Sequence, residues 1–216
     1  MKQAIEYFYQ KTDYLNVGPR KKQPQSSYIL VHQGLVLIRL GKFELPVCKG
    51  QGFWLPSDCL SAVTILQNSV ISSFDFSVRS TVSMPNSAGY VPPSLLVAGI
   101  AEQLGQTVDN SWDGAHGRLL RCARDYFSSV TPDDKYDTKT LQLADAIARL
   151  DGNERLKRSE VLECTGFSED QIALQLKVRD CVKKMKSGHK LKNIAQQASM
   201  PEKELMLLIE RTVGAI

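Results

Sequence analysis

The strongest chemical signal in this sequence is a group of positive charges in the C-terminal third. Seven basic side chains lie between positions 177 and 192, against a single acid, Asp180. They are Lys177, Arg179, Lys183, Lys184, Lys186, Lys190 and Lys192. Such a local field favours a polyanion even though the whole chain carries a net charge of only +4. We predict phosphate contacts through Lys183, Lys184, Lys186, Lys190 and Lys192, with plain solvent exposure as the alternative.

Residues that could hold a metal ion or act as nucleophiles are few and scattered. Only His32 lies in the part of the chain with strand-like patterns, whereas a metal centre inside a β-barrel needs several histidines and a carboxylate. The five cysteines form no C-x-x-C pair, which fits a reducing compartment. We therefore predict no catalytic residues, no metal and no cofactor. Trp54 is the one candidate for lining a ligand cavity, although such a tryptophan is more often core.

Composition and segment lengths predict a soluble cytoplasmic protein. The chain has 216 residues, of which 43% are hydrophobic, as is ordinary for globular proteins. Met1–Gln10 lacks the apolar core of a signal peptide. The longest apolar stretches, Leu35–Ile38 and Leu95–Ala101, are far too short to cross a bilayer. No membrane partner is expected.

The pattern of apolar residues changes along the chain from strand-like to helical. The strand-like runs are Tyr28–His32, Leu35–Leu40, Phe43–Val47, Gly52–Leu55, Leu60–Leu66 and Val70–Val78. Helical periods follow over Leu95–Leu104, Gly117–Ser128 and Asp137–Leu150, the first of them beginning at a predicted cap, Ser94. Many short strands at close spacing are typical of a small sandwich or barrel. We predict an α+β protein: a β domain with trailing helices over residues 1–130, a linker over 131–137 and a helical domain over 138–216.

The helical domain contains an internal repeat. When it is laid over itself with an offset of 33 residues, apolar positions fall on apolar positions. The matched pairs include Val161 with Ile194, Ile172 with Leu205, and Leu176 with Ile209. Each copy has the pattern of a short helix, a tight turn and a second helix. Such helix-turn-helix units leave the outer face of the second helix free to enter a DNA groove.

Local signals for the turns differ between the two copies. In the first, Gly166 can adopt the left-handed conformation that ends a helix, and Ser168 with Gln171 can form a capping box. In the second, Ser199 and Pro201 occupy the places of the glycine and the capping serine.

The segment between the copies predicts a basic helix that joins the two units. Its apolar residues, Val178, Cys181, Val182 and Met185, recur at helical spacing and predict one buried face, with the lysines of the cluster opposite. For contacts to base edges we predict Gln171 and Lys177 in the first unit and Lys203 in the second. A helical bundle with a solvated basic face is the alternative.

With these motifs the chain resembles the AraC/XylS family of bacterial transcription regulators. The similarity rests on Ser187-Gly188-His189, Ile194–Ala198, Leu205 and Gly214, on Leu156–Lys177 with its turn Gly166-Phe167-Ser168, and on Gly34–Leu37 and Gly52–Pro56. The last two look like the cupin-like barrel of many members. The resemblance implies a barrel that binds a small-molecule effector or pairs two copies as a homodimer. It also implies a tail that binds double-stranded DNA.

Two features leave alternatives open. Leu174 and Leu207 stand where the family usually carries an arginine or another polar residue, and Glu202–Arg211 holds more acids than bases. Carboxylates that face phosphates are repelled. The alternative is a regulatory protein–protein interaction module in which the apolar run Leu205–Ile209 docks onto a protein partner. A ligand-binding or catalytic barrel with a helical cap is the third hypothesis.

Overall fold

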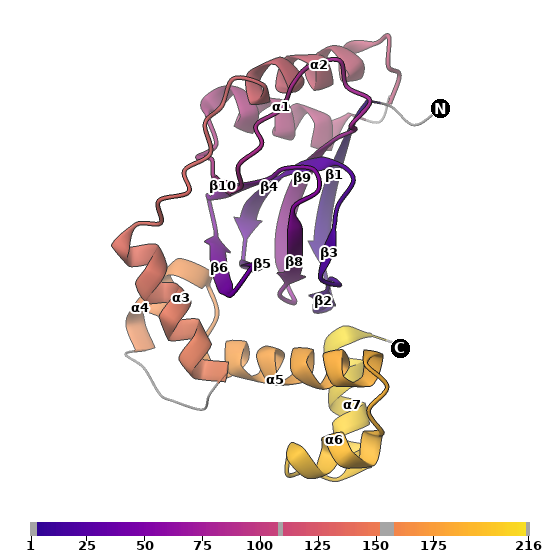
Figure 1. Ribbon diagram of the computed structural model, residues 1–216, viewed down its shortest axis with the longest axis vertical. Coiled ribbons are helices and arrows are strands. Elements are labelled where there is room, and N and C mark those ends of the chain that lie inside the picture. The colour runs from indigo at the N-terminus through magenta and orange to yellow at the C-terminus, as the bar shows by residue number, and fades with distance from the viewer. Residues whose placement is uncertain (1–3, 108–109, 152–157, 215–216) are drawn as a thin grey trace.

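The computed structural model describes residues 4–107, 110–151 and 158–214, in which the chain forms ten strands followed by seven helices (Figure 1). The strands are β1 (Ile5–Thr12), β2 (Asn16–Val17), β3 (Lys21–Lys22), β4 (Ser26–Gln33), β5 (Leu35–Leu40), β6 (Phe43–Cys48), β7 (Gly52–Leu55), β8 (Leu60–Ile65), β9 (Ser69–Phe76) and β10 (Gly89–Tyr90). The helices are α1 (Leu95–Gln106), α2 (Ala115–Phe127), α3 (Thr138–Asp151), α4 (Arg158–Thr165), α5 (Glu169–Lys186), α6 (Leu191–Gln197) and α7 (Glu202–Val213). The predicted α+β class, with the strands first and the helices after them, is confirmed. No helix in these ranges is long and apolar enough to cross a membrane.

The strands form two antiparallel sheets. One has the order β1-β9-β4-β7-β10, and the other has the order β2-β8-β5-β6, with β3 also pairing with β8. Side chains of both sheets, among them Ile29, Val36, Phe53 and Ile71, form a common apolar cluster between them. The β domain is therefore a small sandwich.

The first sheet is covered by α1 and α2. Tyr28, Trp54, Phe74 and Phe127 share a second apolar cluster with Ile100 of α1. Ser94 caps α1 as predicted, because its side chain accepts a hydrogen bond from the backbone N–H of Val97 at 3.2 Å.

The second sheet packs against the helices that follow residue 137. Alternate residues of β5 belong to different clusters: Val36 and Ile38 join the core between the sheets, whereas Leu35 and Leu37 join the core of the helical domain. A strand buried on both faces is a continuous apolar run, as the sequence shows. Figure 1 accordingly places α1 and α2 on one side of the β domain and α3–α7 on the other.

Four strands, β1, β2, β3 and the two-residue β10, are missing from the sequence-based prediction. The strands and helices predicted between residues 28 and 150 match the structure within two residues at each end. β1, β2 and β3 precede this region. β1 was missed because it lies at a sheet edge, where four successive residues, Phe8 to Lys11, are exposed and no apolar alternation is required. Residues 131–137, expected as a linker, are tied to the β domain through Asp133, whose backbone exchanges two hydrogen bonds with Tyr90.

Candidate nucleic-acid interface

The first helix-turn-helix unit is α4, a turn, and the start of α5. Gly166 has a φ of +74°, the left-handed conformation that ends α4. Ser168 then caps α5: its Oγ accepts from the N–H of Gln171 at 3.2 Å, and its own N–H donates to Gln171 Oε1 at 2.9 Å. Both turn predictions are confirmed. The side chain of Gln171 is exposed but bound to the cap, so it must leave this bond to reach a base. Leu156, at the start of the motif, lies outside the described residues.

The second helix of this unit and the basic helix are one continuous element. α5 runs over 18 residues without a break, and its sequence contains no glycine or proline that would end the helix. Val178, Cys181 and Val182 are buried, as their spacing predicts.

Arg179, the one arginine between positions 177 and 192, does not lie with the exposed lysines. This residue is 2% exposed and points toward the β domain. Lys183 lies on the same side of α5. Burial lowers the pKa of its amine, and the positive charge of Arg179 lowers it further.

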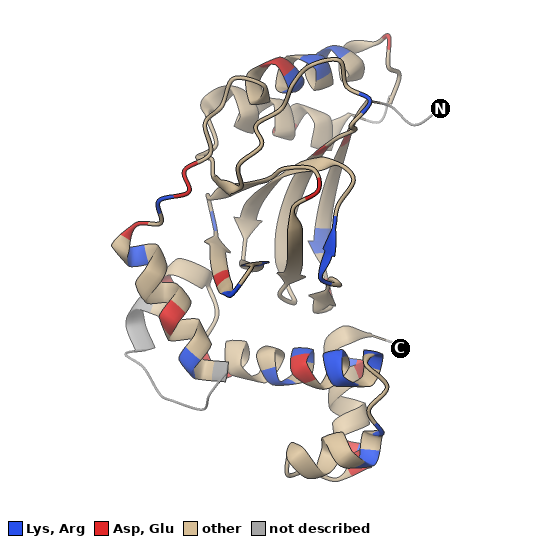
Figure 2. Ribbon diagram, in the orientation of Figure 1, with Lys and Arg blue, Asp and Glu red and all other residues tan. Residues whose placement is uncertain are grey.

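The remaining lysines of the cluster gather where α5 meets α6 (Figure 2). Lys177 Nζ donates to the carbonyl of Ala198 at 3.1 Å, and Lys184 Nζ donates to Gln197 Oε1 at 2.9 Å. These bonds draw both ammonium groups to the C-terminal end of α6. Lys186, Lys190 and Lys192 are exposed around the turn between the two helices. The structure thus brings five of the predicted cations together on a solvent-exposed surface formed by α5 and α6.

The second unit consists of α6 and α7. Ser199, in the place of the turn glycine, has a φ of +54°, and Pro201 stands at the N-cap of α7 without a side-chain cap bond. Lys203 is exposed in the first turn of α7, between Glu202 and Glu204.

The apolar run Leu205–Ile209 does not form one free surface. Leu205 and Ile209 are 1% and 0% exposed because they pack into the chain's own helical core. Leu207 is 47% exposed, and Leu174 on α5 is 45% exposed. The docking surface predicted from the sequence is therefore reduced to Leu207 with the half-buried Met206 and Leu208.

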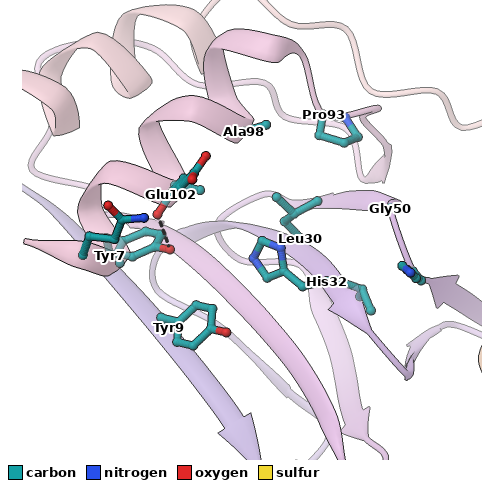
Figure 3. Close-up of a pocket in the computed structure, with 13 residues that line it drawn as sticks. Tyr7, Tyr9, Leu30, His32, Gly50, Pro93, Ala98 and Glu102 are labelled. Carbon is teal, nitrogen blue, oxygen red and sulfur yellow. Dashed lines mark hydrogen bonds between the residues drawn. The ribbon is translucent and has the colours of Figure 1, made fainter.

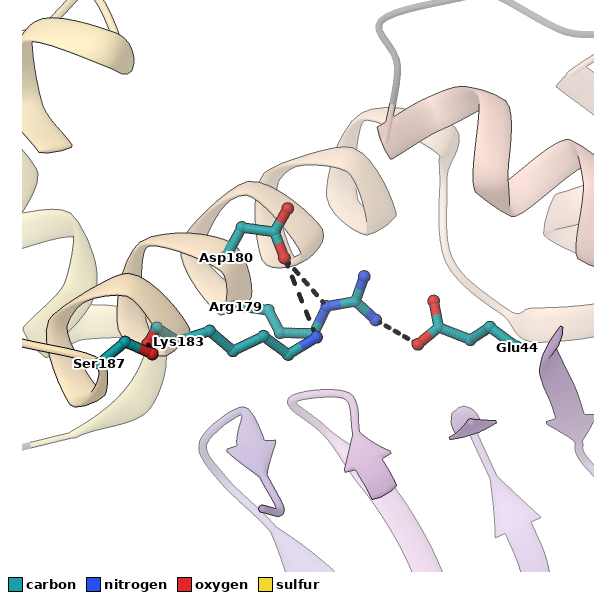
Figure 4. Close-up of polar contacts among 5 residues, drawn as sticks. All are labelled: Glu44, Arg179, Asp180, Lys183 and Ser187. Carbon is teal, nitrogen blue, oxygen red and sulfur yellow. Dashed lines mark hydrogen bonds and ion pairs between the residues drawn. The ribbon is translucent and has the colours of Figure 1, made fainter. Parts of the chain in front are cut away.

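Polar bonds fix both units to the β domain. Arg179 Nη1 lies 2.8 Å from Glu44 Oε1 of β6, and Asp180 Oδ1 lies 3.7 Å from Arg179 Nε (Figure 4). The N–H of Gln67 donates to Gln175 Oε1 of α5 at 2.8 Å. At the other unit, the N–H of Leu15 donates to the carbonyl of Thr212 in α7 at 2.7 Å. Sequence reasoning missed these contacts, since nothing local to Glu44 distinguishes it from a solvated carboxylate.

The β domain carries a groove between the first sheet and α1 (Figure 3), with a volume of about 710 Å³. Tyr7 and Tyr9 of β1 and His32 of β4 form its floor, and Glu102 lies on the helix side. His32 Nε2 lies 2.9 Å from Ser72 Oγ, and burial lowers the pKa of its imidazole. Trp54 is not part of this lining.

Trp54 is fully buried in the core beneath α2. Its ring stacks on Phe127 at 5.7 Å between centroids, and its Nε1–H donates to the carbonyl of Pro85 at 3.0 Å. Among the residues that the structure describes, no three His, Cys, Asp or Glu side chains are placed to hold a metal ion.

Comparisons with known proteins give similarity at the level of structure alone. No protein-family model matches the sequence, and no curated protein is similar to it. Two crystal structures of ToxT from Vibrio cholerae align with this chain with TM-scores of 0.42 and 0.41 and sequence identities of 11% and 13%. Each alignment covers 99% of this chain and 95% of the ToxT chain. A Vibrio cholerae transcriptional regulator of the HTH_3 family has a TM-score of 0.29 and 14% identity, over 35% of this chain and 44% of its own. TM-scores below 0.5 give no residue-level guide to function.

Proposed function

We propose that this chain is a DNA-binding transcription regulator of the AraC type. The observation that carries the proposal is the pair of helix-turn-helix units joined by α5, with exposed lysines gathered where α5 meets α6. The phosphate contacts come from Lys184, Lys186, Lys190 and Lys192, and base contacts from Lys177 and Lys203, with Gln171 available once its cap bond opens. Lys183 lies toward the β domain and makes at most a minor contact.

The test is the salt dependence of binding to duplex DNA. Each phosphate contact contributes about 0.9 to the slope of log affinity against log salt. The double variant Lys190→Gln/Lys192→Gln should lower that slope by about 1 to 2 and weaken binding on every duplex.

The matched control is Lys42→Gln/Lys139→Gln, which removes the same charge from two exposed positions outside this surface. Its salt slope should equal that of the wild type. Equal losses in both double variants would mean that only net charge matters. Absence of binding at low salt would exclude the proposal.

One other function, a protein–protein interaction module, is favoured by the exposed leucines on the second helix of each helix-turn-helix unit. Leu174 and Leu207 occupy the positions from which a recognition helix reads bases, and about half of each side chain is open to solvent. In a DNA reader, Leu174→Gln and Leu207→Gln should alter sequence preference and leave the salt slope intact. In an interaction module, the same two substitutions should abolish a stable complex with the protein partner and leave the affinity for DNA unchanged.

We further propose that the groove beneath α1 receives a small-molecule effector. Ala98, Ala101 and Gly105 lie on one side of α1 and leave the space open, while Tyr9, His32 and Lys49 offer polar groups beside the apolar Leu30 and Val31. Ala98 is exposed, so Ala98→Leu should fill the groove without disturbing the core. Native mass spectrometry should find a small molecule retained by the wild type and lost from this variant. Equal retention by both proteins would exclude the groove as its site.

A further inference from the structure

β1 is an open edge of the first sheet. In the sheet order β1 is the terminal strand, and its one neighbour is β9. Its N-terminal end is covered, with Ile5 at 0% exposure, whereas Phe8 and Tyr9 are 48% and 58% exposed. Such large aromatic side chains on a bare strand edge are costly to leave in water.

The hydrogen bonds of the sheet show which backbone groups point outward. Ser77, directly opposite Ala4, donates its N–H to the carbonyl of Ala4 at 2.9 Å, so Ala4 faces β9. Because orientation alternates along an antiparallel ladder, Glu6, Phe8 and Gln10 also face β9. Tyr7, Tyr9 and Lys11 therefore direct their N–H and C=O groups away from the sheet.

Nothing in β1 protects this edge from pairing. Edge strands are usually shielded by proline, by a bulge or by several charges. β1 contains no proline, and its register with β9 is continuous from Ile5 to Thr12. Glu6 and Lys11, one near each end, are its only charges.

We propose that a second copy of this chain pairs with β1, antiparallel, about a two-fold axis at Phe8. Residues that lie opposite each other in the two copies then have numbers that add to 16. Odd-numbered residues, whose backbone N–H and C=O groups point away from β9, are therefore paired with odd-numbered residues. Tyr7 exchanges backbone hydrogen bonds with Tyr9 of the second copy, and the two Phe8 side chains meet at the axis. Glu6 lies opposite Gln10 of the second copy, where a carboxylate and an amide can hydrogen-bond.

A second copy suits this edge because one half of β1 is buried by the helices and the other half is exposed to solvent. An antiparallel two-fold places the bare half of one strand, around Tyr9, beside the half of the other strand that α2 covers. A partner strand alone buries less than the roughly 1,200 Å² of a stable interface, so the second copy must also bury the bare face beside Tyr9. The dimer should therefore dissociate on dilution.

This inference specifies the pairing role of the β domain within the proposed function, and it is tested without DNA, so the two can fail separately. Sedimentation velocity over a concentration series should show the wild type passing from monomer to dimer. Tyr9→Pro removes an outward N–H and no bond to β9, so it should stay monomeric with an unchanged thermal transition. Tyr9→Phe, the control, should dimerise as the wild type does.

A disulfide tests the register directly and does not depend on the proline variant folding. In a background with the exposed Cys122 and Cys164 replaced by Ser, Phe8→Cys should form a covalent dimer on mild oxidation. Leu95→Cys, on a residue that is 94% exposed, should not. A wild type that is monomeric at every concentration would overturn the inference. So would equal cross-linking at both positions, or a dimer that persists in folded Tyr9→Pro.

Discussion

The ion pair between Glu44 and Arg179 gives the sharpest test of how the helical domain is held. Arg179 is 2% exposed on α5, and the side chain of Glu44 on β6 is 23% exposed (Figure 4). Glu44→Ala removes the carboxylate that lies 2.8 Å from Arg179 Nη1 and leaves the guanidinium buried, with Asp180 Oδ1 3.7 Å from its Nε. We expect this variant to be destabilised.

The size of the effect follows from the burial of the two partners. Removing one partner of a fully buried ion pair costs about 3–5 kcal/mol. Because Glu44 is partly hydrated and Asp180 remains nearby, we expect roughly 2 kcal/mol for Glu44→Ala. In a chain of 216 residues this lowers Tm by about 4–8 °C. Arg179→Met removes the buried charge itself and leaves Glu44 access to water, so it should cost about 1 kcal/mol or less.

The order of stabilities is the decisive result, measured by urea and thermal unfolding of both single variants and the double variant. Glu44→Ala/Arg179→Met should be more stable than Glu44→Ala alone, because the second change also removes the buried charge that Glu44 balances. Glu102→Ala, at an exposed carboxylate of α1, should change stability by less than about 0.5 kcal/mol. Additive losses in the double variant would refute the reasoning, since they would show that each residue acts without the other.

Three further predictions concern single positions. Ser199→Gly should stabilise the protein by roughly 0.5–1 kcal/mol in urea unfolding, because φ is +54° there, and Gly166→Ser, at a φ of +74°, should destabilise it. Gly117→Ala should be strongly destabilising and poorly expressed, because the new Cβ would lie 1.8 Å from the backbone oxygen of Trp112. Burial lowers the pKa of His32 below 6.5, so the folded state takes up a proton less readily than the unfolded state. The urea midpoint should therefore fall as pH drops below 6.5 and stay level above it, and His32→Gln should lose that part of the pH dependence.

Local signals in the sequence were sufficient wherever neighbouring residues decide the structure. The cap of α1 at Ser94 and the capping box of Ser168 with Gln171 depend on atoms three residues apart. The buried stripe of α5 through Val178 and Val182 depends on helical period alone. These features need no knowledge of the rest of the chain.

Features that depend on distant partners could not be predicted. Arg179 belongs to a run of exposed cations by sequence, and its ion pair with Glu44, 135 residues earlier, helps to make its burial tolerable. Leu205 and Ile209 looked available for a partner because their own core is assembled from both helix-turn-helix units and from β5. β1 has no apolar alternation because one of its edges and half of one face are bare.

The bonds between the domains connect the open edge of the sheet to the second helix-turn-helix unit. Leu15 follows β1 by three residues, and its N–H holds the carbonyl of Thr212 near the end of α7. Tyr7 and Tyr9 of the same strand line the groove beneath α1. Any occupant that moves β1, whether a small molecule in the groove or a second copy at the edge, therefore acts on a segment that is hydrogen-bonded to α7. The first unit is held separately, through Gln175 and Arg179, so such a movement would change the placement of one unit relative to the other.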